Sequence, residues 1–469
     1  MPSSLALFLT LGFIAYLFYR DFRGRPNVTS ALWLPFLWIV VGPGSRFLSQ
    51  WLDILGFHVG GVSVEDGSPI DAAFYFGLIA TALLVLYRRR VSLGRFIRNN
   101  RWLALYLVFC LIAVSWSDFP YVSFKRWIKL LGDPVMALVI LTEPEPMAAL
   151  AQLGKRCAYF MLPLSILFIK YFPDLGRYFD PWSGAPMNTG VSTNKNELGF
   201  DCWILGMIVF WHMLHVLKWE RSRLKWNELM LCSGLLAMDV WLLRMAQSMS
   251  SLVAFALGSA IMLFFGLRWV RVQRAGAYIA AGAAICVIAG TVGFFGDFIH
   301  LLGRNETLTG RTDIWRMLWN WNINPIIGTG FEGFWLGERR EEIQSVQPAL
   351  NEAHNGYLET YLNLGFIGVG ITIAMLLAAY AKSRRQLFHN FEFGRLSLAY
   401  LVSFILYNWT EAAFRLNGLP FFMFFVVAIN YPAVADYVPA PAPEPSFQRP
   451  AFGLAPAENW QGGSIRKAA

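Results

Sequence analysis

Two residues in one long polar interval have side chains suited to transfer chemistry. The interval runs from Gly303 to Gly370 and is the longest polar stretch in a mostly apolar chain. Arg311 lies near its start, and a guanidinium donates paired, charge-assisted hydrogen bonds to phosphate oxygens. His354 lies near its end, and an imidazole whose pKa is close to the ambient pH can act as a general base. A histidine in a helix cap region can equally be structural, so the pattern alone leaves both roles open.

Two further polar groups stand at predicted helix starts. Lys195 and Asn196, in VSTNKNELGF, lie at a helix N-terminus, where free backbone N–H groups and the helix dipole favour an anion. Asn355 lies beside His354, in the cap region of a helix that begins near Tyr357. These residues are predicted to bind substrate, and the alternative for Lys195 is an ordinary cap with a surface lysine.

A polar interruption, LLRMAQSMSSLVAF, separates two apolar runs. Arg244 lies close to the membrane edge, where an ionisable residue is a candidate for a site. Ser248, Ser250 and Ser251 offer hydrogen bonds on a tight turn, although serines also serve as helix caps. We predict that these four residues contribute to substrate binding.

Basic residues gather at the start of another predicted helix, in SDFPYVSFKRWIK. Arg126, with Lys125 and Lys129, can meet a lipid phosphate at the outer leaflet. The alternative is that long basic side chains anchor the helix at the interface. Arg126 is included among the predicted substrate-binding residues.

The sequence predicts no metal site and no disulfide framework. It contains no ligand spacing such as HExxH. No CxxC pair is present, and all five cysteines fall inside predicted membrane spans: Cys110, Cys157, Cys202, Cys232 and Cys286.

The elements that must position these residues are membrane helices. Hydrophobic residues form 56% of the chain and charged residues only 15%, which is typical of a membrane protein. Apolar runs of about 20 residues cross a bilayer as helices. An all-α polytopic protein with 12–13 spans is predicted, with the spans at about 4–19, 31–43, 71–87, 101–116, 127–142, 156–172, 196–217, 228–246, 250–267, 277–295, 357–381, 396–411 and 417–432.

Orientation follows from the lysines and arginines of the short connections. The basic connections, such as RRRVSLGRFIRNNR and KWERSRLK, are predicted to be cytoplasmic. One large loop, about 296–353, then lies on the outer side, between the tenth and eleventh spans. The net charge of +9 belongs mostly to the cytoplasmic anchors and argues against a nucleic-acid partner. We therefore expect a polytopic membrane domain over 1–435 and a disordered, Pro- and Ala-rich cytoplasmic tail over 436–469.

Several motifs together resemble one family. They are STNKNELG, AQSMSSL, TLTGRTDIW, P-x-x-G-x-G and AHNGYLETYLNLG, which follow one another in this order. The chain resembles the O-antigen ligase/polymerase superfamily of bacterial envelope enzymes, and within it the exopolysaccharide-polymerase branch. The resemblance covers about 190–370.

The resemblance implies a GT-C-like enzyme of the bacterial inner membrane, with its active site facing the periplasm. Such an enzyme transfers a glycan from an undecaprenyl-diphosphate carrier to a sugar hydroxyl, without a metal or nucleotide cofactor. By position, Arg311 corresponds to the essential loop arginine and His354 to the histidine of H-N/S-x-x-L. Lys195, Asn196 and the turn Ser248–Ser251 match motifs of less settled role. The arginine that often follows the turn's serine is absent here, and Arg244 is its candidate replacement.

Four functions remain open at this stage. A polymerase would use the next lipid-linked repeat as acceptor, whereas a ligase would use a lipid A core or a protein. A transporter or flippase for the same glycan would show charged residues near mid-membrane and an internal repeat, and neither is evident in the sequence. A scaffold subunit would leave Arg311 and His354 replaceable. The expected partners are lipid-linked oligosaccharide, membrane lipids and other polysaccharide export or chain-length proteins.

Overall fold

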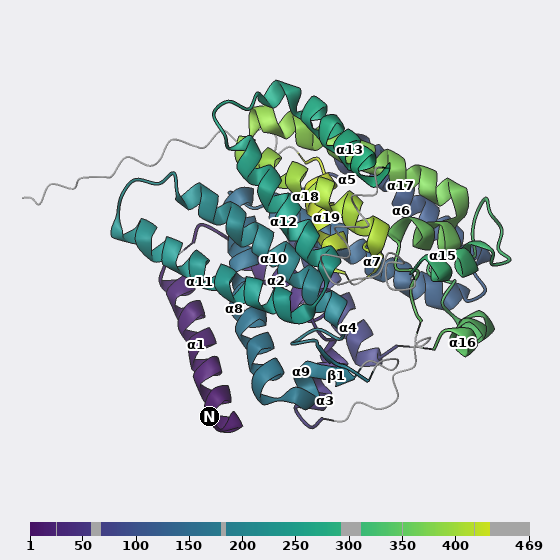
Figure 1. Ribbon diagram of the computed structural model, residues 1–469, viewed down its shortest axis with the longest axis horizontal. Helices are drawn as coiled ribbons and strands as arrows, with labels where there is room; N and C mark the ends of the chain where they lie inside the picture. The colour runs from purple at the N-terminus through teal and green to yellow at the C-terminus, as the bar shows by residue number, and fades with distance from the viewer. Residues whose placement is uncertain are drawn as a thin grey trace, which may run out of the picture. The chain divides into compact units, whose positions relative to one another are not determined.

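The computed structural model describes residues 1–24, 26–57, 67–179, 184–291, 311–348, 350–416 and 418–431. These residues form helices almost throughout (Figure 1). The α-helices are α1 (Ser3–Arg23), α2 (Trp33–Val40), α3 (Leu48–Ile54), α4 (Pro69–Arg88), α5 (Leu93–Asn99), α6 (Arg101–Ile112), α7 (Pro120–Leu141), α8 (Pro146–Tyr171), α9 (Pro173–Gly176), α10 (Lys195–Val216), α11 (Arg223–Ala246), α12 (Met249–Phe265), α13 (Ala275–Thr291), α15 (Arg311–Trp319), α16 (Gly337–Val346), α17 (Gly356–His389), α18 (Phe391–Thr410) and α19 (Leu419–Ala428). Short 3-10 helices lie at η1 (Ser30–Leu32), η2 (Ala113–Trp116) and η3 (Val272–Arg274), and the strands β1 (Arg177–Phe179) and β2 (Pro186–Asn188) pair antiparallel.

Every predicted span coincides with a helix, which confirms an all-α polytopic membrane protein. Among the described helices, α1, α4, α10, α11 and α17 are long and apolar enough to cross a membrane alone. A sixth span results if α5 and the α6–η2 helix, which are bent by 105° at their junction, are counted together. The prediction of 12–13 spans counted every apolar run. Several of these helices are too short to cross alone, because α2, α12 and α19 have 8, 17 and 10 residues.

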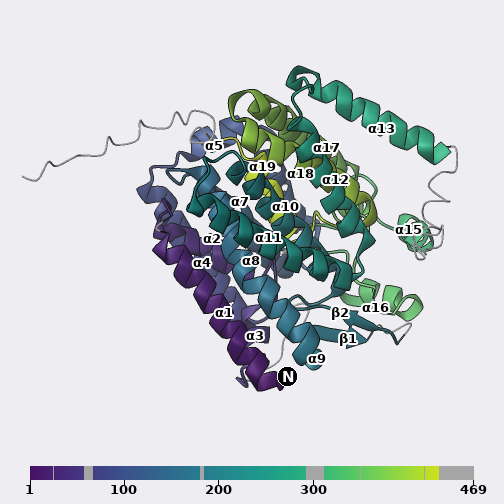
Figure 2. The same cartoon turned by 60° about the vertical axis from the view of Figure 1, so that its left-hand side comes forward.

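Helix α10 lies among other helices, whereas α1 is peripheral (Figures 1 and 2). In its most apolar window 67% of the α10 residues are buried, against 22% in α1. Helix α10 packs on α8, α11, α12 and α19. Trp203 of α10 stacks on Tyr400 and Tyr407 of α18, with ring centroids 5.9 and 4.8 Å apart. The start of α10 is therefore held against the end of α18.

Helix α17 is broken at Gly365, and the loop before α16 pairs with the break. Gly365 has φ 62° and ψ −167°, a backbone conformation that favours glycine. A Cβ there would lie 2.3 Å from the carbonyl carbon of Ile326. Around the break, Thr329 N donates to Leu362 O at 3.1 Å and Phe366 N donates to Pro325 O at 2.9 Å. The P-x-x-G-x-G motif and the glycine of LNLG therefore make one backbone junction.

The described part of the large loop forms a small folded unit beside the start of α17. Leu318 of α15 and Ile343 of α16 are fully buried with Phe334, Leu358 and Leu362 in one apolar cluster. Ile314 and Met317 of α15, and Trp321 just after it, pack on the same cluster. The predicted tail, 436–469, lies outside the described residues.

Candidate active site

Glu411 joins the two predicted catalytic residues. One carboxylate oxygen pairs with Arg311 Nη2 at 2.5 Å, and the other lies 3.2 Å from His354 Nδ1. Glu411 is 4% exposed, so little solvent screens these contacts. The main chain adds a further contact, because Arg311 Nη1 donates to Thr410 O. Arg311 and His354 lie 43 residues apart in the sequence and meet at one carboxylate contributed by the α18–α19 connection.

A second ion pair extends this arrangement. His354 Nδ1 also lies 3.0 Å from Glu352 Oε1, and the other oxygen of Glu352 accepts from Arg415 Nη1 at 2.8 Å. The order is thus Arg311, Glu411, His354, Glu352, Arg415, with charges alternating along the row. We call these five residues the Glu411 cluster.

The carboxylates keep the imidazole of the Glu411 cluster protonated. Burial opposes the charge on His354, but the negative charges of Glu352 and Glu411 outweigh it and raise the pKa to about 10. Burial likewise opposes ionisation of Glu352, yet His354 and Arg415 hold its pKa below its usual range. At neutral pH three cations therefore face two carboxylates within the cluster, and Glu197, Glu359 and Glu332 also act on Arg415.

The loop before α17 holds His354 in an unusual backbone conformation. Its φ is 47°, in the left-handed region that a non-glycine residue adopts at a cost. Asn355 caps α17, since its side chain accepts from Tyr357 N and Leu358 N at 3.0 Å each. Glu359 accepts from Ala353 N at 2.9 Å and fixes the residue just before the histidine. Most of the A-H-N-G-Y-L-E motif therefore serves to position the His354 side chain.

Glycine is required in that motif because two segments approach closely. A Cβ on Gly356 would lie 2.0 Å from Asn408 Oδ1. The same Asn408 oxygen accepts from Ala413 N at 3.1 Å and Phe414 N at 3.2 Å, which turns the chain just after Glu411. The loop that carries His354 and the α18–α19 connection that carries Glu411 thus hold each other in position.

The turn between α11 and α12 contacts the residue next to Glu411. Ser250 Oγ lies 3.0 Å from the hydroxyl of Thr410, the residue whose carbonyl binds Arg311. Ser248 and Ser251 bond to each other at 3.0 Å. A Cβ on Gly199 of α10 would lie 2.7 Å from both serine side chains, so this glycine lets the turn pack on the helix.

The other predicted residues differ in how close they lie to the Glu411 cluster. Asn196 reaches the site, with Nδ2 3.4 Å from Glu411 Oε2. Asn194 is the cap of α10, as the alternative interpretation expects, and Lys195 is a half-buried first residue of that helix. Arg244 is exposed near the end of α11, and within the described part of the chain it makes no contact with the Glu411 cluster.

A cavity of about 930 Å³ opens beside the cluster. Its lining includes Glu411, Glu352, Arg415 and Asn196, and it also includes Arg126 of α7. Cavities that bind organic ligands are commonly of this size. The cavity therefore gives a large ligand access to Glu411, Glu352 and Arg415 and brings the predicted α7 residue into the same space, whereas Arg311 and His354 are not among its lining residues.

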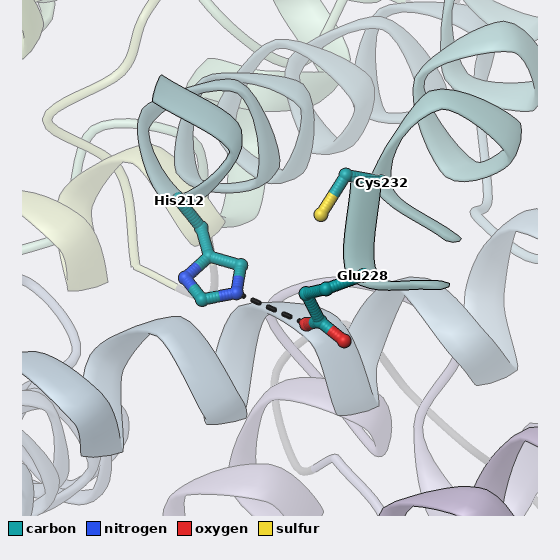
Figure 3. Close-up of side chains that lie close together, drawn as sticks. All are labelled: His212, Glu228 and Cys232. Carbon is teal, nitrogen blue, oxygen red and sulfur yellow. Dashed lines mark hydrogen bonds and ion pairs between the residues drawn. The ribbon is translucent and has the colours of Figure 1, made fainter. Parts of the chain in front are cut away.

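Two groups of the described residues have metal-binding geometry, which the sequence did not indicate. One is Glu352, His354 and Glu411; the other is His212, Glu228 and Cys232 (Figure 3). In the second group Glu228 Oε1 lies 3.1 Å from His212 Nε2 and 2.7 Å from Lys155 Nζ. In the first, both carboxylates already pair with guanidinium groups. Because these fixed cations repel a metal ion, we interpret both groups as ion-pair clusters.

Two buried carboxylates inside the helices were not singled out from the sequence, Asp201 of α10 and Asp239 of α11. Asp201 accepts from Ser192 Oγ at 2.8 Å, and Asp239 lies beside the Cys202 thiol. Neither residue lines the cavity beside the Glu411 cluster.

Sequence reasoning missed three members of the site. Glu352 lies inside the quoted histidine motif, and Glu411 and Arg415 lie four residues apart in a short connection between two apolar runs. Charged residues at the end of a membrane span are candidates for a site by default, which is the signal that could have revealed them.

Two comparisons with known proteins fit this placement. Residues 234–373 match the family described as O-antigen ligase, a range that contains Ser250, Arg311 and His354. The chain is 28% identical over 330 residues to the exopolysaccharide production protein ExoQ of Rhizobium meliloti (strain 1021), covering 67% of this chain and 71% of that protein. The predicted resemblance to the O-antigen ligase/polymerase superfamily and its exopolysaccharide branch is thereby confirmed, and the chain is a multi-pass membrane protein.

Proposed function

We propose that this chain is a glycosyltransferase that lengthens a lipid-linked glycan during exopolysaccharide synthesis. The donor is a glycan on undecaprenyl diphosphate, and the acceptor is a sugar hydroxyl of the next lipid-linked repeat. The Glu411 cluster beside the cavity carries this proposal, because it places a guanidinium and an imidazolium in direct contact with one carboxylate. The family match over 234–373 and the exopolysaccharide relative support it.

The reaction exchanges one carbon–oxygen bond for another. The acceptor oxygen attacks the anomeric carbon, the bond from that carbon to the diphosphate oxygen breaks, and the lipid diphosphate leaves with both bonding electrons. The hydroxyl proton passes to a base of the protein. A single displacement inverts the anomeric centre, and no carboxylate is assigned as a nucleophile.

Arg311 binds the leaving diphosphate in this proposal. Negative charge grows on the phosphate oxygens as the bond breaks, and a guanidinium suits them through paired hydrogen bonds. In the structure Arg311 pairs with Glu411. The donor therefore competes with Glu411 for Arg311, and its binding releases the carboxylate.

The raised pKa of His354 changes the role that its residue type suggested. An imidazole with a pKa of about 10 is already protonated at neutral pH and has no free nitrogen to accept a proton. We assign His354 as a cation that holds the diphosphate together with Arg311. The released carboxylate of Glu411 is then the proton acceptor, since it borders the cavity where the hydroxyl must enter.

The remaining predicted residues position this machinery. Asn196 bonds Glu411 and keeps an orienting contact on it when Arg311 turns away. Ser250 and Asn355 bond to the last turn of α18, through the Thr410 hydroxyl and Trp409 O. Orientation toward the periplasm, in the bacterial inner membrane, is proposed from the basic connections on the opposite side.

The test is glycan transfer by purified full-length protein in detergent with EDTA present. Wild type and the exposed control Arg316→Gln are expected to convert undecaprenyl-diphosphate oligosaccharide into a ladder of longer lipid-linked products. Arg311→Ala and His354→Ala are expected to lose at least about 100-fold in rate. Full activity in both alanine variants would remove the site assignment, as a scaffold role predicts. Transfer only to an added lipid A core or protein would replace polymerase with ligase.

A further inference from the structure

The short helix α5 follows α4 in the chain and precedes the α6–η2 helix. The axes of α5 and the α6–η2 helix are bent by 105° at their junction. After Arg101, α6 is apolar, and it packs on the spanning helix α17. Because α6 crosses the bilayer beside α17, the bend leaves α5 close to the plane of the membrane surface.

Helix α5 has the two faces of a helix that lies at a membrane surface. Phe96 is 7% exposed and packs in the core, whereas Leu93 and Ile97, one turn apart, are 70% and 47% exposed. At about 3.6 residues per turn, these three apolar side chains share one side of the helix, and Arg95 and Arg98 lie on the other. A surface helix of this kind buries its apolar side among acyl chains and keeps its basic side at the headgroups.

Both ends of α5 are fixed to the rest of the protein. Asn100, just after the helix, donates from Nδ2 to Asn430 O at 3.1 Å and accepts from Asn430 N at 2.6 Å. Ser92, the cap, accepts from Arg95 N at 3.3 Å and donates its N–H to Tyr431 Oη at 3.4 Å. A helix of seven residues is not stable alone, so these contacts hold it. The arginines of α5 are therefore presented from a fixed place.

The segment that contains α5 is strongly basic. Residues 87–102 include six arginines and no acidic residue. Arg89 pairs with Glu143. Five other arginines are exposed, and within the described part of the chain their side chains make no hydrogen bond or ion pair: Arg88, Arg90, Arg95, Arg98 and Arg101. Tyr87 and Trp102, at the two ends of the segment, are exposed aromatic residues of the kind that gather at the membrane–water interface.

We propose that α5 is a binding surface for anionic phospholipid. The exposed arginines suit the phosphate oxygens of a headgroup, and the apolar side of the helix suits the acyl chains beside it. A free phosphate ion would satisfy the arginines but leave Leu93 and Ile97 in water, so the whole helix favours a lipid. The proposed orientation assigns this lipid to the cytoplasmic leaflet. The inference does not depend on the glycan-transfer reaction.

The experiment measures which lipid lies against α5 in vesicles. Full-length Ile97→Cys carrying a bimane label is reconstituted in mixtures of phosphatidylcholine and phosphatidylglycerol, with one of the two lipids brominated in its acyl chains. Bromine quenches a fluorophore in contact with it, so the quenching reports the ratio of the two lipids at α5. The test variant adds Arg95→Gln with Arg98→Gln. The matched control adds Arg384→Gln with Arg385→Gln, two exposed arginines near the end of α17. Labelled protein without the new cysteine gives the background.

Both brominated lipids should quench the label, with phosphatidylglycerol favoured about fivefold over phosphatidylcholine at low salt. The preference should disappear in the test variant, remain in the control, and weaken at high salt because salt screens exposed charges. An unquenched label would place α5 in water and overturn the proposal. So would equal affinity for the two lipids before any arginine is changed, equal losses in the test and control variants, or a preference unaffected by salt. Failure of the proposed function would leave these results unchanged, since no glycan substrate is used.

Discussion

Two clusters in this protein use the same residue types and differ in their surroundings. The Glu411 cluster and the group around Glu228 each combine a histidine, carboxylate and basic side chains. Glu228 is bonded from three helices, by Arg20 of α1, Lys155 of α8 and His212 of α10. Its neighbours are in regular helices and none lines the large cavity. The Glu411 cluster instead comes mostly from connections, includes a left-handed His354, and borders that cavity.

The comparison shows that composition does not identify a site. An ion-pair cluster can join neighbouring helices. The backbone groups of each helix are hydrogen-bonded within that helix, so the charged side chains are left to pair with one another. A site for chemistry needs access and fixed side chains that do not pair permanently.

Loss of the Arg311 guanidinium should have a large effect on transfer. Arg311→Lys keeps the charge but not the planar pair of donors, so we expect transfer to stay at least about 30-fold below wild type. Arg311→Ala should fall lower still. Rates of lipid-linked ladder formation give the measurement. Wild-type rates in Arg311→Lys would show that a point charge suffices and that the paired geometry is irrelevant.

The pH dependence separates the two roles for His354. Its pKa rises from 6.5 to about 10 on folding, so its stabilising charge is fully present below about 6.5 and is lost as pH rises through about 10. A cationic role predicts nearly constant transfer between pH 7 and 9 and a decline near 10. A neutral base predicts a rise of about tenfold per pH unit over the same range. The measurement is kcat against pH, with thermal unfolding followed in parallel.

The Glu228 group should affect stability and leave chemistry intact. Glu228→Gln removes the carboxylate that Arg20 and Lys155 share, and breaking a buried pair costs about 3 kcal/mol. We expect a lower Tm with an unchanged transfer rate per folded molecule. Loss of transfer at unchanged Tm would mean that this group, and not only the Glu411 cluster, takes part in the reaction.

The contact between the α11–α12 turn and α10 should be sensitive to one methyl group. Gly199→Ala places a Cβ against Ser248 and Ser251 and should cost about 1–3 kcal/mol, with a several-fold drop in transfer. The matched control is Gly234→Ala in α11, where no atom lies within 4 Å of the new Cβ. Thermal unfolding of both variants checks the difference, and equal Tm values would contradict the close approach.

The smallest effect is expected at Arg244. Its side chain is exposed at the end of α11, and the described residues give it no contact with the cluster. Arg244→Gln should change transfer by less than about twofold, as most exposed substitutions do. A loss comparable to that of Arg311→Ala would restore Arg244 as the second diphosphate ligand.

The sequence predicts features that depend on neighbouring residues, such as helices and caps. It does not predict contacts between segments that are far apart in the sequence. Apolar runs determine membrane helices, so each predicted span contains one. The place of Asn355 in a helix cap follows from residue type. The ion pair between Arg311 and Glu411 could not be predicted. It forms only because the fold brings the α18–α19 connection into contact with a segment about 100 residues earlier in the sequence. The pKa of His354 depends on the same meeting, so its protonation state also required the structure.

The most direct test of the central claim compares binding with turnover in Glu411→Gln. The substitution frees Arg311 from its carboxylate and removes the assigned proton acceptor, while an amide keeps the shape. We predict that this variant binds undecaprenyl diphosphate more tightly than wild type and transfers no glycan. Weaker binding, or turnover near the wild-type rate, would contradict a site in which Glu411 and the donor diphosphate compete for Arg311.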